Sequence, residues 1–388
     1  MHFAAIAIAL ISLLIWLALF FFNGHFWQIW SAEADREKAG APSVWPSVVA
    51  VVPARNEAET IKETVSALLR QNYSGRLSIL VVDDHSEDGT GELARNAARE
   101  RDPAKRVTVI SAPDLAPGWT GKLWALQSGV TCAAAIAPDF YWFTDADIVH
   151  SPDTLKELIS RAENNHLDLA SLMVLLQARS FVEKLIIPPF LYFFLMLYPP
   201  SRIESEKSRT AGAAGGCILL RRETLERAGG LATIRSEIID DCSLARVIKR
   251  SGGKIWMGLT RASISLRRYA NWPELQNMIA RTAFTQLNYS VLRLIGTLFG
   301  LLMTFVAPVV LTFSTNPRIW VPALLAWCVM SASFLPTVVF YRLSPIWSPA
   351  LPLSALFYSY ATLLSALRYW RGRGGQWKGR AQAPGAGK

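Results

Sequence analysis

The chain has 388 residues, which at about 150 residues per domain predicts two or three folding units. Hydrophobic residues make up 51% of it, with 14 Trp and 18 Phe, and this composition excludes an intrinsically disordered chain. The four cysteines form no Cys-x-x-Cys pair, so neither a disulfide framework nor a zinc ribbon is expected.

The positive charge lies at the C-terminal end of the chain. The formal net charge is +10, yet the last acidic residue is Glu274, and ten of the 40 basic residues follow it. Residues 1–274 are therefore formally neutral. A nucleic-acid-binding protein spreads basic charge over its folded domain, so this distribution excludes that class and is typical of a membrane protein.

Residues 1–32 are predicted to form an N-terminal transmembrane anchor. They contain no Asp, Glu, Lys or Arg, and Phe3 to Phe22 is almost continuously apolar. Twenty helical residues at ~1.5 Å each span a hydrocarbon core of ~30 Å. A cleaved signal peptide would carry a basic amino-terminal region and a small-x-small cleavage site, and we find neither.

Residues 42–282 have the pattern of a soluble α/β domain. Short apolar runs alternate with amphipathic segments of helical length, which predicts βαβ units and a mostly parallel sheet flanked by helices. In such sheets ligands bind at the carboxyl ends of the strands. The predicted strands are 47–52, 77–82, 107–110 and 140–144, and the predicted helices are 58–71, 88–101 and 121–135.

Polar side chains follow three of these strands. Pro53–Glu57 follows the first strand, Asp83–Thr90 the second and Asp145–Asp147 the fourth. An Asp-x-Asp at a strand end offers hard oxygen ligands to Mg²⁺ or Mn²⁺, which in turn bridges a diphosphate. Each motif alone is usually a solvated turn, but the three in order indicate a nucleotide site. Gly118–Leu123 lacks the spacing of a phosphate-binding P-loop.

Residues 185–200 are predicted to form an interfacial helix. Pro188-Pro189 and Pro199-Pro200 would leave only nine residues for an unbroken helix, about 14 Å long and too short to cross a bilayer. An aromatic-rich helix of that length is expected to lie in the membrane plane. An ordinary buried helix of the soluble domain is the alternative.

Three further apolar stretches, at 292–314, 319–341 and 347–368, are predicted to be membrane helices, and residues 369–388 a basic tail. Buried helices of a soluble core are the alternative, although three such stretches without an acidic residue are uncommon there.

These motifs resemble those of the family 2 glycosyltransferases with a GT-A fold. The resemblance rests on Pro53–Glu57, Asp83–Thr90, Asp145–Asp147 and the later Gly215-Gly216 and Asp240-Asp241. More narrowly, Ser208–Tyr269 and Met278–Leu287 are similar to the hopanoid (hopene)-associated glycosyltransferases.

The resemblance implies a role for each matching residue. Asp84 would hydrogen-bond a uracil-type base, Asp145 would face the ribose and diphosphate, and Asp147, with Asp145, would bind Mn²⁺ or Mg²⁺. Asp241 would be the general base, with Asp240 beside it in an undefined role. The nucleotide and donor sugar would contact Pro53, Ala54, Arg55, Glu57, Asp83, Asp84, Lys122, Asp145, Gly215 and Gly216.

The resemblance also implies an inverting, non-processive transfer from a nucleotide-sugar donor, of the UDP type, to a membrane lipid acceptor related to hopanoids. Processive synthases carry a Gln-x-x-Arg-Trp signature, whereas here Gln276 is followed by Arg281 and Thr282. The alternatives are a polyprenyl-phosphate glycosyltransferase and a non-enzymatic membrane protein that retains a nucleotide-binding domain. No nucleic-acid partner is expected.

The expected location is the bacterial inner membrane, with the catalytic domain in the cytoplasm. Three complete C-terminal crossings would then put the basic tail outside, against the positive-inside rule. Pro345, Pro349 and Pro352 make 347–368 the best candidate for an incomplete span, so a cytoplasmic tail is expected.

Overall fold

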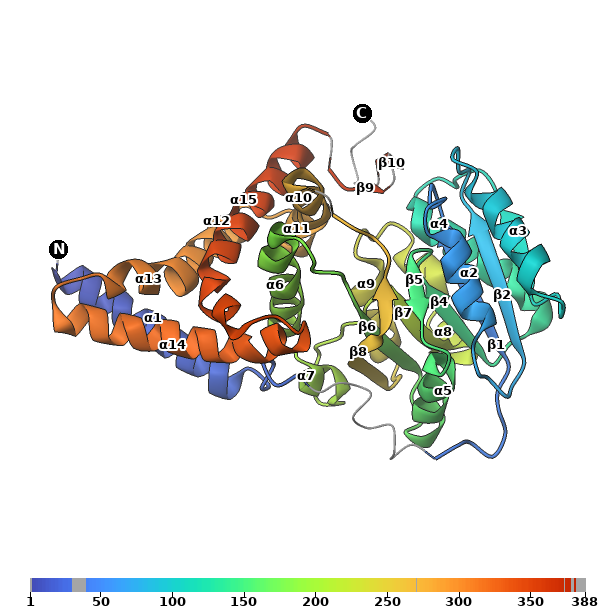
Figure 1. The fold of residues 1–388 in the computed structure, drawn as a ribbon, viewed down its shortest axis with the longest axis horizontal. Coiled ribbons are helices and arrows are strands. Elements are labelled where there is room, and N and C mark those ends of the chain that lie inside the picture. Colours follow the sequence, from blue (N-terminus) through green and yellow to red (C-terminus); the bar gives the residue numbers. More distant parts are fainter. Residues whose placement is uncertain (1, 30–39, 270, 373, 378–379, 382–388) are drawn as a thin grey trace.

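We analysed a computed structural model of the chain, which describes residues 2–29, 40–269, 271–372, 374–377 and 380–381. An α/β domain and a group of long helices lie side by side in it (Figure 1). Residues 373, 378–379 and 382–388 of the predicted basic tail lie outside the described residues, as do positions 30–32 of the predicted anchor.

The α/β domain is built on one mixed, eight-stranded sheet with the order β3-β2-β1-β4-β7-β6-β8-β5. The first four strands of the sheet order are parallel, while β7 runs antiparallel to both β4 and β6. The four predicted strands are confirmed as β1 to β4. The strands are β1 (Val48–Ala54), β2 (Leu77–Asp83), β3 (Val107–Ser111), β4 (Phe140–Thr144), β5 (Ile148–His150), β6 (Leu169–Leu175), β7 (Cys217–Arg221) and β8 (Ile255–Ser265).

Helices cover both faces of this sheet, which explains why its central strands are continuously apolar. On β1, Val48 and Val52 belong to a core with α2, α3 and α5, whereas Val49 and Val51 belong to a second core with α4 and α9. The helices are α2 (Ile61–Leu69), α3 (Thr90–Arg101), α4 (Gly121–Ala133), α5 (Thr154–Asn164), α8 (Arg222–Arg227) and α9 (Asp240–Arg250), with short 3₁₀ turns η2 (Ala134–Ile136) and η3 (Leu231–Ile234).

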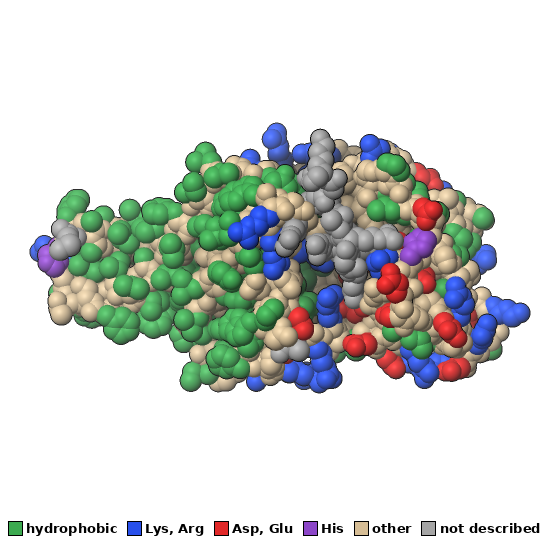
Figure 2. Space-filling view, turned by 90° about the horizontal axis from the view of Figure 1, so that it is seen from above, with side chains coloured by type: hydrophobic (Ala, Val, Ile, Leu, Met, Phe, Trp, Pro, Cys, Tyr) green, Lys and Arg blue, Asp and Glu red, His purple; other side chains and the backbone are tan. Residues whose placement is uncertain are grey.

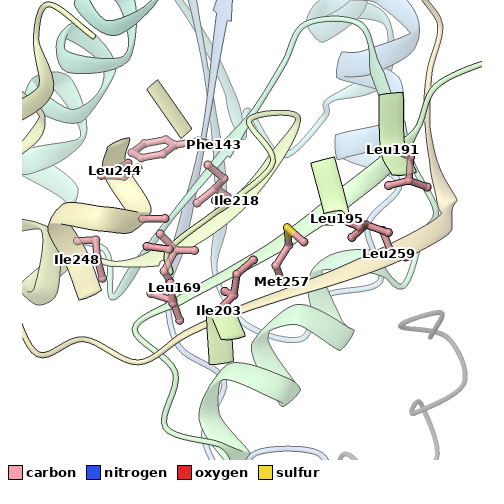
Figure 3. Close-up of a cluster of buried hydrophobic side chains, with 14 of the residues drawn as sticks. Phe143, Leu169, Leu191, Leu195, Ile203, Ile218, Leu244, Ile248, Met257 and Leu259 are labelled. Atoms are coloured by element: carbon pink, nitrogen blue, oxygen red, sulfur yellow. The ribbon is translucent and has the colours of Figure 1, made fainter. Parts of the chain in front are cut away.

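The second core continues from the sheet into the helices beside it. Figure 3 shows Phe143 and Ile218 of the sheet in one cluster with Leu191 and Leu195 of α6 (Phe181–Leu197). Three short helices complete this layer: α7 (Pro200–Glu204), α10 (Trp272–Ala280) and α11 (Ala283–Gln286). The α/β domain is therefore anchored to the helical part through packed side chains.

Within the part of the chain that the structure describes, five helical stretches are long and apolar enough to cross a membrane, by length and composition. Figure 2 shows apolar side chains over the helical end of the molecule, and charged side chains over the α/β end. One is the stretch Phe181–Glu204, which contains α6 and α7. The others are α1 (His2–Phe22), α12 (Val291–Leu301) with the π-turn η4 (Leu302–Val306) and α13 (Ala307–Thr312), α14 (Pro317–Phe340), and η5 (Pro345–Ala350) with α15 (Leu351–Trp370). A two-stranded ribbon, β9 (Gln376–Trp377) and β10 (Arg380–Ala381), follows α15.

The predicted nine-residue helix within 185–200 is wrong in its length. Pro188 and Pro189 lie inside α6, which is continuous over 17 residues. The helix begins with a capping box, in which Ser180 and Glu183 each accept a hydrogen bond from the other's backbone N–H. Pro188 and Pro189 are the eighth and ninth residues of this helix, and neither can donate an i→i−4 hydrogen bond. The backbone oxygen of Leu185, four residues before Pro189, instead accepts a hydrogen bond from the Ser354 hydroxyl at 2.7 Å.

Candidate active site

The sheet topology brings the predicted site residues to one edge. The parallel strands β1, β2 and β4 end there, and each is followed by one of the three polar motifs. The antiparallel pairing of β7 with β4 joins Cys217 to Thr144, so Gly215 and Gly216 lie beside Asp145. Helix α9 begins at this edge with Asp240 and Asp241 in its first turn.

Lys122 is the electrostatic centre of this edge. Its Nζ lies 2.9 Å from Oδ1 of Asp145 and 3.3 Å from Oδ2 of Asp240. Burial lowers the pKa of Lys122, but the carboxylates of Asp145 and Asp240 outweigh that effect and raise the pKa above its ordinary value. Lys122 therefore stays cationic and holds β4 and α9 together by attraction. Sequence spacing could not reveal these two carboxylate partners of Lys122. Its contact with a nucleotide stays a prediction.

Asp241 is held by two backbone N–H groups. Its Oδ2 accepts from Gly215 at 2.9 Å, and its Oδ1 accepts from Cys242 at 2.7 Å. Burial, and then the neighbouring charge of Asp240, raise the pKa of Asp241 to about 6. A carboxylate with that pKa is charged at neutral pH and still basic enough to accept a proton.

Asp147 and Asp145 are suited to a hard divalent cation. Oδ2 of Asp147 accepts a hydrogen bond from the Ser265 hydroxyl at 2.8 Å, which fixes the orientation of the carboxylate. Among the described residues, no group of three or more His, Cys, Asp or Glu side chains forms a ready-made metal cage. Two carboxylates leave most coordination positions open, as suits a cation that also binds phosphate oxygens.

The residues after β1 and β2 form a closed polar cluster. The Arg55 guanidinium donates to the backbone oxygen of Asp84 at 2.5 Å and lies 3.7 Å from the Asp84 carboxylate, which is fully buried. Asp83 accepts from the Ser86 backbone N–H at 3.1 Å and so shapes the loop. Ala54 is also fully buried. These residues brace the loop in this structure, and contact between Asp84 and a base stays a prediction.

Two cavities meet at Asp147. One, of about 820 Å³, is lined by Glu57, Arg268 and Glu274. The other, of about 250 Å³, is lined by Pro53, Lys122, Gly215 and Gly216 and by the four aspartates Asp145, Asp147, Asp240 and Asp241. The two cavities share Glu57, Asp147, Arg267, Tyr269, Met278 and Arg281.

Several lining residues were not among the nucleotide, metal and catalytic residues expected from the sequence. Phe190 and Phe194 of α6 line the smaller cavity together with Met173 and Leu176. Arg281, directly after α10, lines both cavities. The only sequence signal for the phenylalanines is their spacing of four, which puts them on one face of a helix. That signal is hidden in a segment that is apolar all round.

Gly215 is required by close packing at the site. A Cβ atom there would lie 3.2 Å from Nζ of Lys122 and 3.3 Å from Oδ2 of Asp241. We expect Gly215→Ala to displace both side chains and to lower turnover without unfolding the protein. Gly300→Ala is the matched control, because its Cβ meets nothing within 4 Å. Steady-state kinetics of both variants test this, and equal turnover would show that the close approach is dispensable.

A mixed α/β sheet with paired aspartates at this edge defines a GT-A-like nucleotide-sugar transferase fold. The model of the family described as "Glycosyltransferase like family 2" matches residues 46–283, which is more than half of the chain. The chain belongs to this family.

Comparisons with individual proteins agree with this assignment. The chain is 29% identical over 117 residues to an N-acetylglucosaminyltransferase of Rhizobium leguminosarum bv. phaseoli, an alignment covering 30% of this chain and 25% of that protein. It is 28% identical over 114 residues to the 4,4'-diaponeurosporenoate glycosyltransferase of Staphylococcus haemolyticus, covering 29% and 27%. The chain thus matches about a quarter of the length of each relative.

One solved structure is similar over almost the whole chain. The mannosyltransferase PcManGT of Pyrobaculum calidifontis, solved in complex with GDP-Man and Mn²⁺, superposes with a TM-score of 0.54 at 19% identity. The alignment covers 94% of this chain and 99% of that one. At this identity the likeness shows the fold alone.

Proposed function

We propose that this protein transfers a sugar from a nucleotide-diphosphate donor to a membrane lipid, with inversion at the anomeric carbon. The observation that carries the proposal is the smaller cavity, which is lined both by carboxylates and by aromatic side chains of α6. Phe190 and Phe194 belong to none of the nucleotide motifs, and apolar side chains lining a transfer site suit a lipid acceptor.

Basic side chains that line the smaller cavity suit the phosphates of the donor. Lys122, Arg267 and Arg281 line the smaller cavity and can neutralise phosphate charge. Asp147 and Asp145 would hold Mn²⁺ or Mg²⁺, which when bound stabilises negative charge on the leaving diphosphate. The resemblance to family members supports a uracil-type base, whereas PcManGT was solved with GDP-Man. The base is therefore part of the test below.

The proposed reaction is a single displacement. The acceptor hydroxyl forms a bond to the anomeric carbon while the bond between that carbon and the diphosphate oxygen breaks, and the nucleoside diphosphate leaves with the bonding electrons. Asp241 takes the hydroxyl proton as general base. Its two backbone hydrogen bonds keep the carboxylate in one orientation, and Ile238 lines the same cavity and limits access of water.

We further propose that the acceptor is a hopanoid-related lipid and that transfer is non-processive. Support comes from the similarity of Ser208–Tyr269 to hopanoid-associated glycosyltransferases and from the missing Gln-x-x-Arg-Trp signature. The S. haemolyticus relative is named as a glycosyltransferase of 4,4'-diaponeurosporenoate. A polyprenyl phosphate is the second candidate, because Arg267 and Arg281 could also pair with an acceptor phosphate. The proposed location is the bacterial inner membrane, with the α/β domain in the cytoplasm.

One experiment tests the function directly. The purified full-length protein is incubated with extracted membrane lipids, Mn²⁺ and either UDP- or GDP-linked sugars, and the lipids are analysed by mass spectrometry. We expect one lipid species to gain the mass of a single sugar with one class of donor. Lipid extracts from a deletion strain should lack that product. Transfer only to water or to soluble acceptors would contradict the proposal.

Adjacent phenylalanines of α6 provide a matched test of the acceptor wall. Phe190 and Phe194 line the cavity, whereas Phe193 points to the long helices, with its ring 5.4 Å from Phe305 and 4.8 Å from Tyr358. We expect Phe194→Ala to raise KM for the lipid acceptor and to leave donor affinity unchanged. Phe193→Ala should instead destabilise the protein by about 3–5 kcal/mol, the usual cost of truncating a buried Phe.

The two variants are compared by acceptor kinetics and by thermal unfolding in the same detergent. If Phe194→Ala alters only stability, or Phe193→Ala alters only acceptor KM, the assignment of this wall to the acceptor is wrong.

A further inference from the structure

The chain turns back on itself after α14. The last turn of α14 lies at the α/β domain, since the guanidinium of Arg261 on β8 sits 5.2 Å from the ring centroid of Phe340. The 3₁₀ segment η5 then runs back along α14. Trp327 donates from Nε1 to the backbone oxygen of Pro349 at 3.1 Å, and Ser348 donates to the backbone oxygen of Ser331. Trp327 lies 13 residues before Phe340, so η5 returns about 20 Å along the helix axis.

Helix α15 then leads out again toward the α/β domain. Near its start, the hydroxyls of Ser354 and Tyr358 donate to the backbone oxygens of Leu185 and Ile186 on α6, at 2.7 and 3.1 Å. Near its end, Ser365 bonds to residues 280 and 284, which precede α12. Figure 1 shows α15 crossing the direction of α1 and α14 and ending above α10 and α11.

The described basic residues divide unequally between the two ends of the long helices. Arg318, at the connection between α13 and α14, is at the end far from the α/β domain. Arg202 is at the near end, because it donates to the backbone oxygen of Phe22, the last residue of α1. The other arginines at helix ends near the domain are Arg281, Arg293, Arg342, Arg368 and Arg371. An excess of Arg on one side marks the cytoplasmic face.

We propose that Pro345–Trp370 is a re-entrant segment. It enters the membrane leaflet next to the α/β domain and returns to the same face, so that only α1, the α12–η4–α13 helix and α14 cross the bilayer. Non-helical backbone at membrane depth must be covered by protein. The bonds from Trp327 and Ser348 supply that cover for η5.

The partner of this segment is the acyl region of that leaflet. Leu353, Leu356, Tyr360 and Leu363 are exposed at helical spacing along α15. The opposite face of α15 carries the small and hydroxyl residues that bond to α6 and to residues 280 and 284. The re-entrant segment therefore supports α6 from the side away from the active site, through the contact of Tyr358 with Phe193.

The side of the membrane on which each helix end lies is tested with single exposed cysteines in vesicles of known orientation. Cys132 on α4 and Cys328 on α14 are the exposed native cysteines. The protein with Cys328→Ser keeps Cys132 as a marker of the α/β side. In the double Cys132→Ser, Cys328→Ser background, Thr315→Cys marks the α13–α14 connection and Arg371→Cys the end of α15. A membrane-impermeant maleimide is applied to vesicles of both orientations.

We expect Arg371→Cys to react in the same vesicles as Cys132, and Thr315→Cys to react only in vesicles of the opposite orientation. Reaction of Arg371→Cys together with Thr315→Cys would show that α15 crosses the bilayer and would overturn the proposal.

A depth measurement separates a re-entrant helix from one lying flat on the surface. Leu353→Cys and Leu363→Cys, in the same double-serine background, are labelled with a fluorophore in liposomes of lipids brominated at defined acyl positions. We expect the label at 353 to be quenched most by bromines deep in the leaflet, and the label at 363 by bromines near the headgroups. Equal depths, or a deeper label at 363, would overturn the proposal.

Discussion

We expect Asp241→Asn to lower turnover by about 10²–10⁴, the usual contribution of a general base. An amide cannot take the acceptor proton. Its single oxygen can accept from only one of the two N–H groups, of Gly215 and Cys242, that the carboxylate binds. Donor affinity should be nearly unchanged, because the proposed role of Asp241 is toward the acceptor. The measurements are turnover and donor dissociation constant at one metal concentration.

Asp240→Asn is the matched control for this variant. It removes the same charge from the same helix turn. Asp240 pairs with Lys122 at 3.3 Å and is not the proposed base. We expect a smaller loss. If Asp240→Asn is the inactive variant and Asp241→Asn turns over normally, the base has been assigned to the wrong residue of the pair.

The pH dependence gives an independent readout of the same base. The pKa of Asp241 is raised to about 6, so the charged base predominates above that pH and is lost below it. We expect kcat/KM to fall about tenfold per pH unit on the acid side of that pKa. The acid limb should disappear in Asp241→Asn, while Asp240→Asn should keep it. A limb that persists in Asp241→Asn would belong to another group.

The second large effect is expected from Asp147→Ala, which should abolish divalent-metal-dependent binding of the nucleotide sugar. The variant removes a carboxylate that Ser265 orients at 2.8 Å and that lines both cavities. Two carboxylates bind a hard cation weakly on their own, so losing one should leave too few ligands to hold the metal with the diphosphate. Isothermal titration with donor and Mn²⁺ measures the loss.

Asp114→Ala serves as the charge-matched control, because Asp114 is a fully exposed surface acid. It should bind donor normally. Both proteins must give the same unfolding temperature without metal, which separates loss of ligand from loss of fold. Wild-type turnover that survives excess EDTA would contradict metal dependence through Asp147.

The α/β domain could be predicted largely from local sequence. The apolar runs that became β1, β2 and β4 are buried on both faces, and such strands have few alternatives to a parallel sheet. Pro53–Glu57, Asp83–Thr90 and Asp145–Asp147 could be placed at one edge, because the carboxyl ends of parallel strands share an edge. The strands β5, β6, β7 and β8 escaped prediction, since they pair across long sequence separations.

The details of the site depended on tertiary structure. The partners of Lys122 come from β4 and α9, 23 and 118 residues away in sequence, and no local pattern reports such a distance. The same holds for the roles of neighbouring residues on α6. Phe193 and Phe194 are equivalent in composition, but packing against Phe305 and Tyr358 turns one to the long helices and leaves the other at the cavity.

The sequence by itself determined that the chain combines helices long and apolar enough to cross a membrane with an α/β domain, because hydrophobic length and the order of strands and acids are local properties. Only the tertiary structure decided how the last helix runs. Three prolines before and within the start of α15 marked the segment as unusual, but its direction depends on the hydrogen bonds between α14 and η5, from Trp327 to Pro349 and from Ser348 to Ser331. Such contacts join two segments that are each apolar. Hydropathy identifies apolar segments but does not say which of them pack against each other.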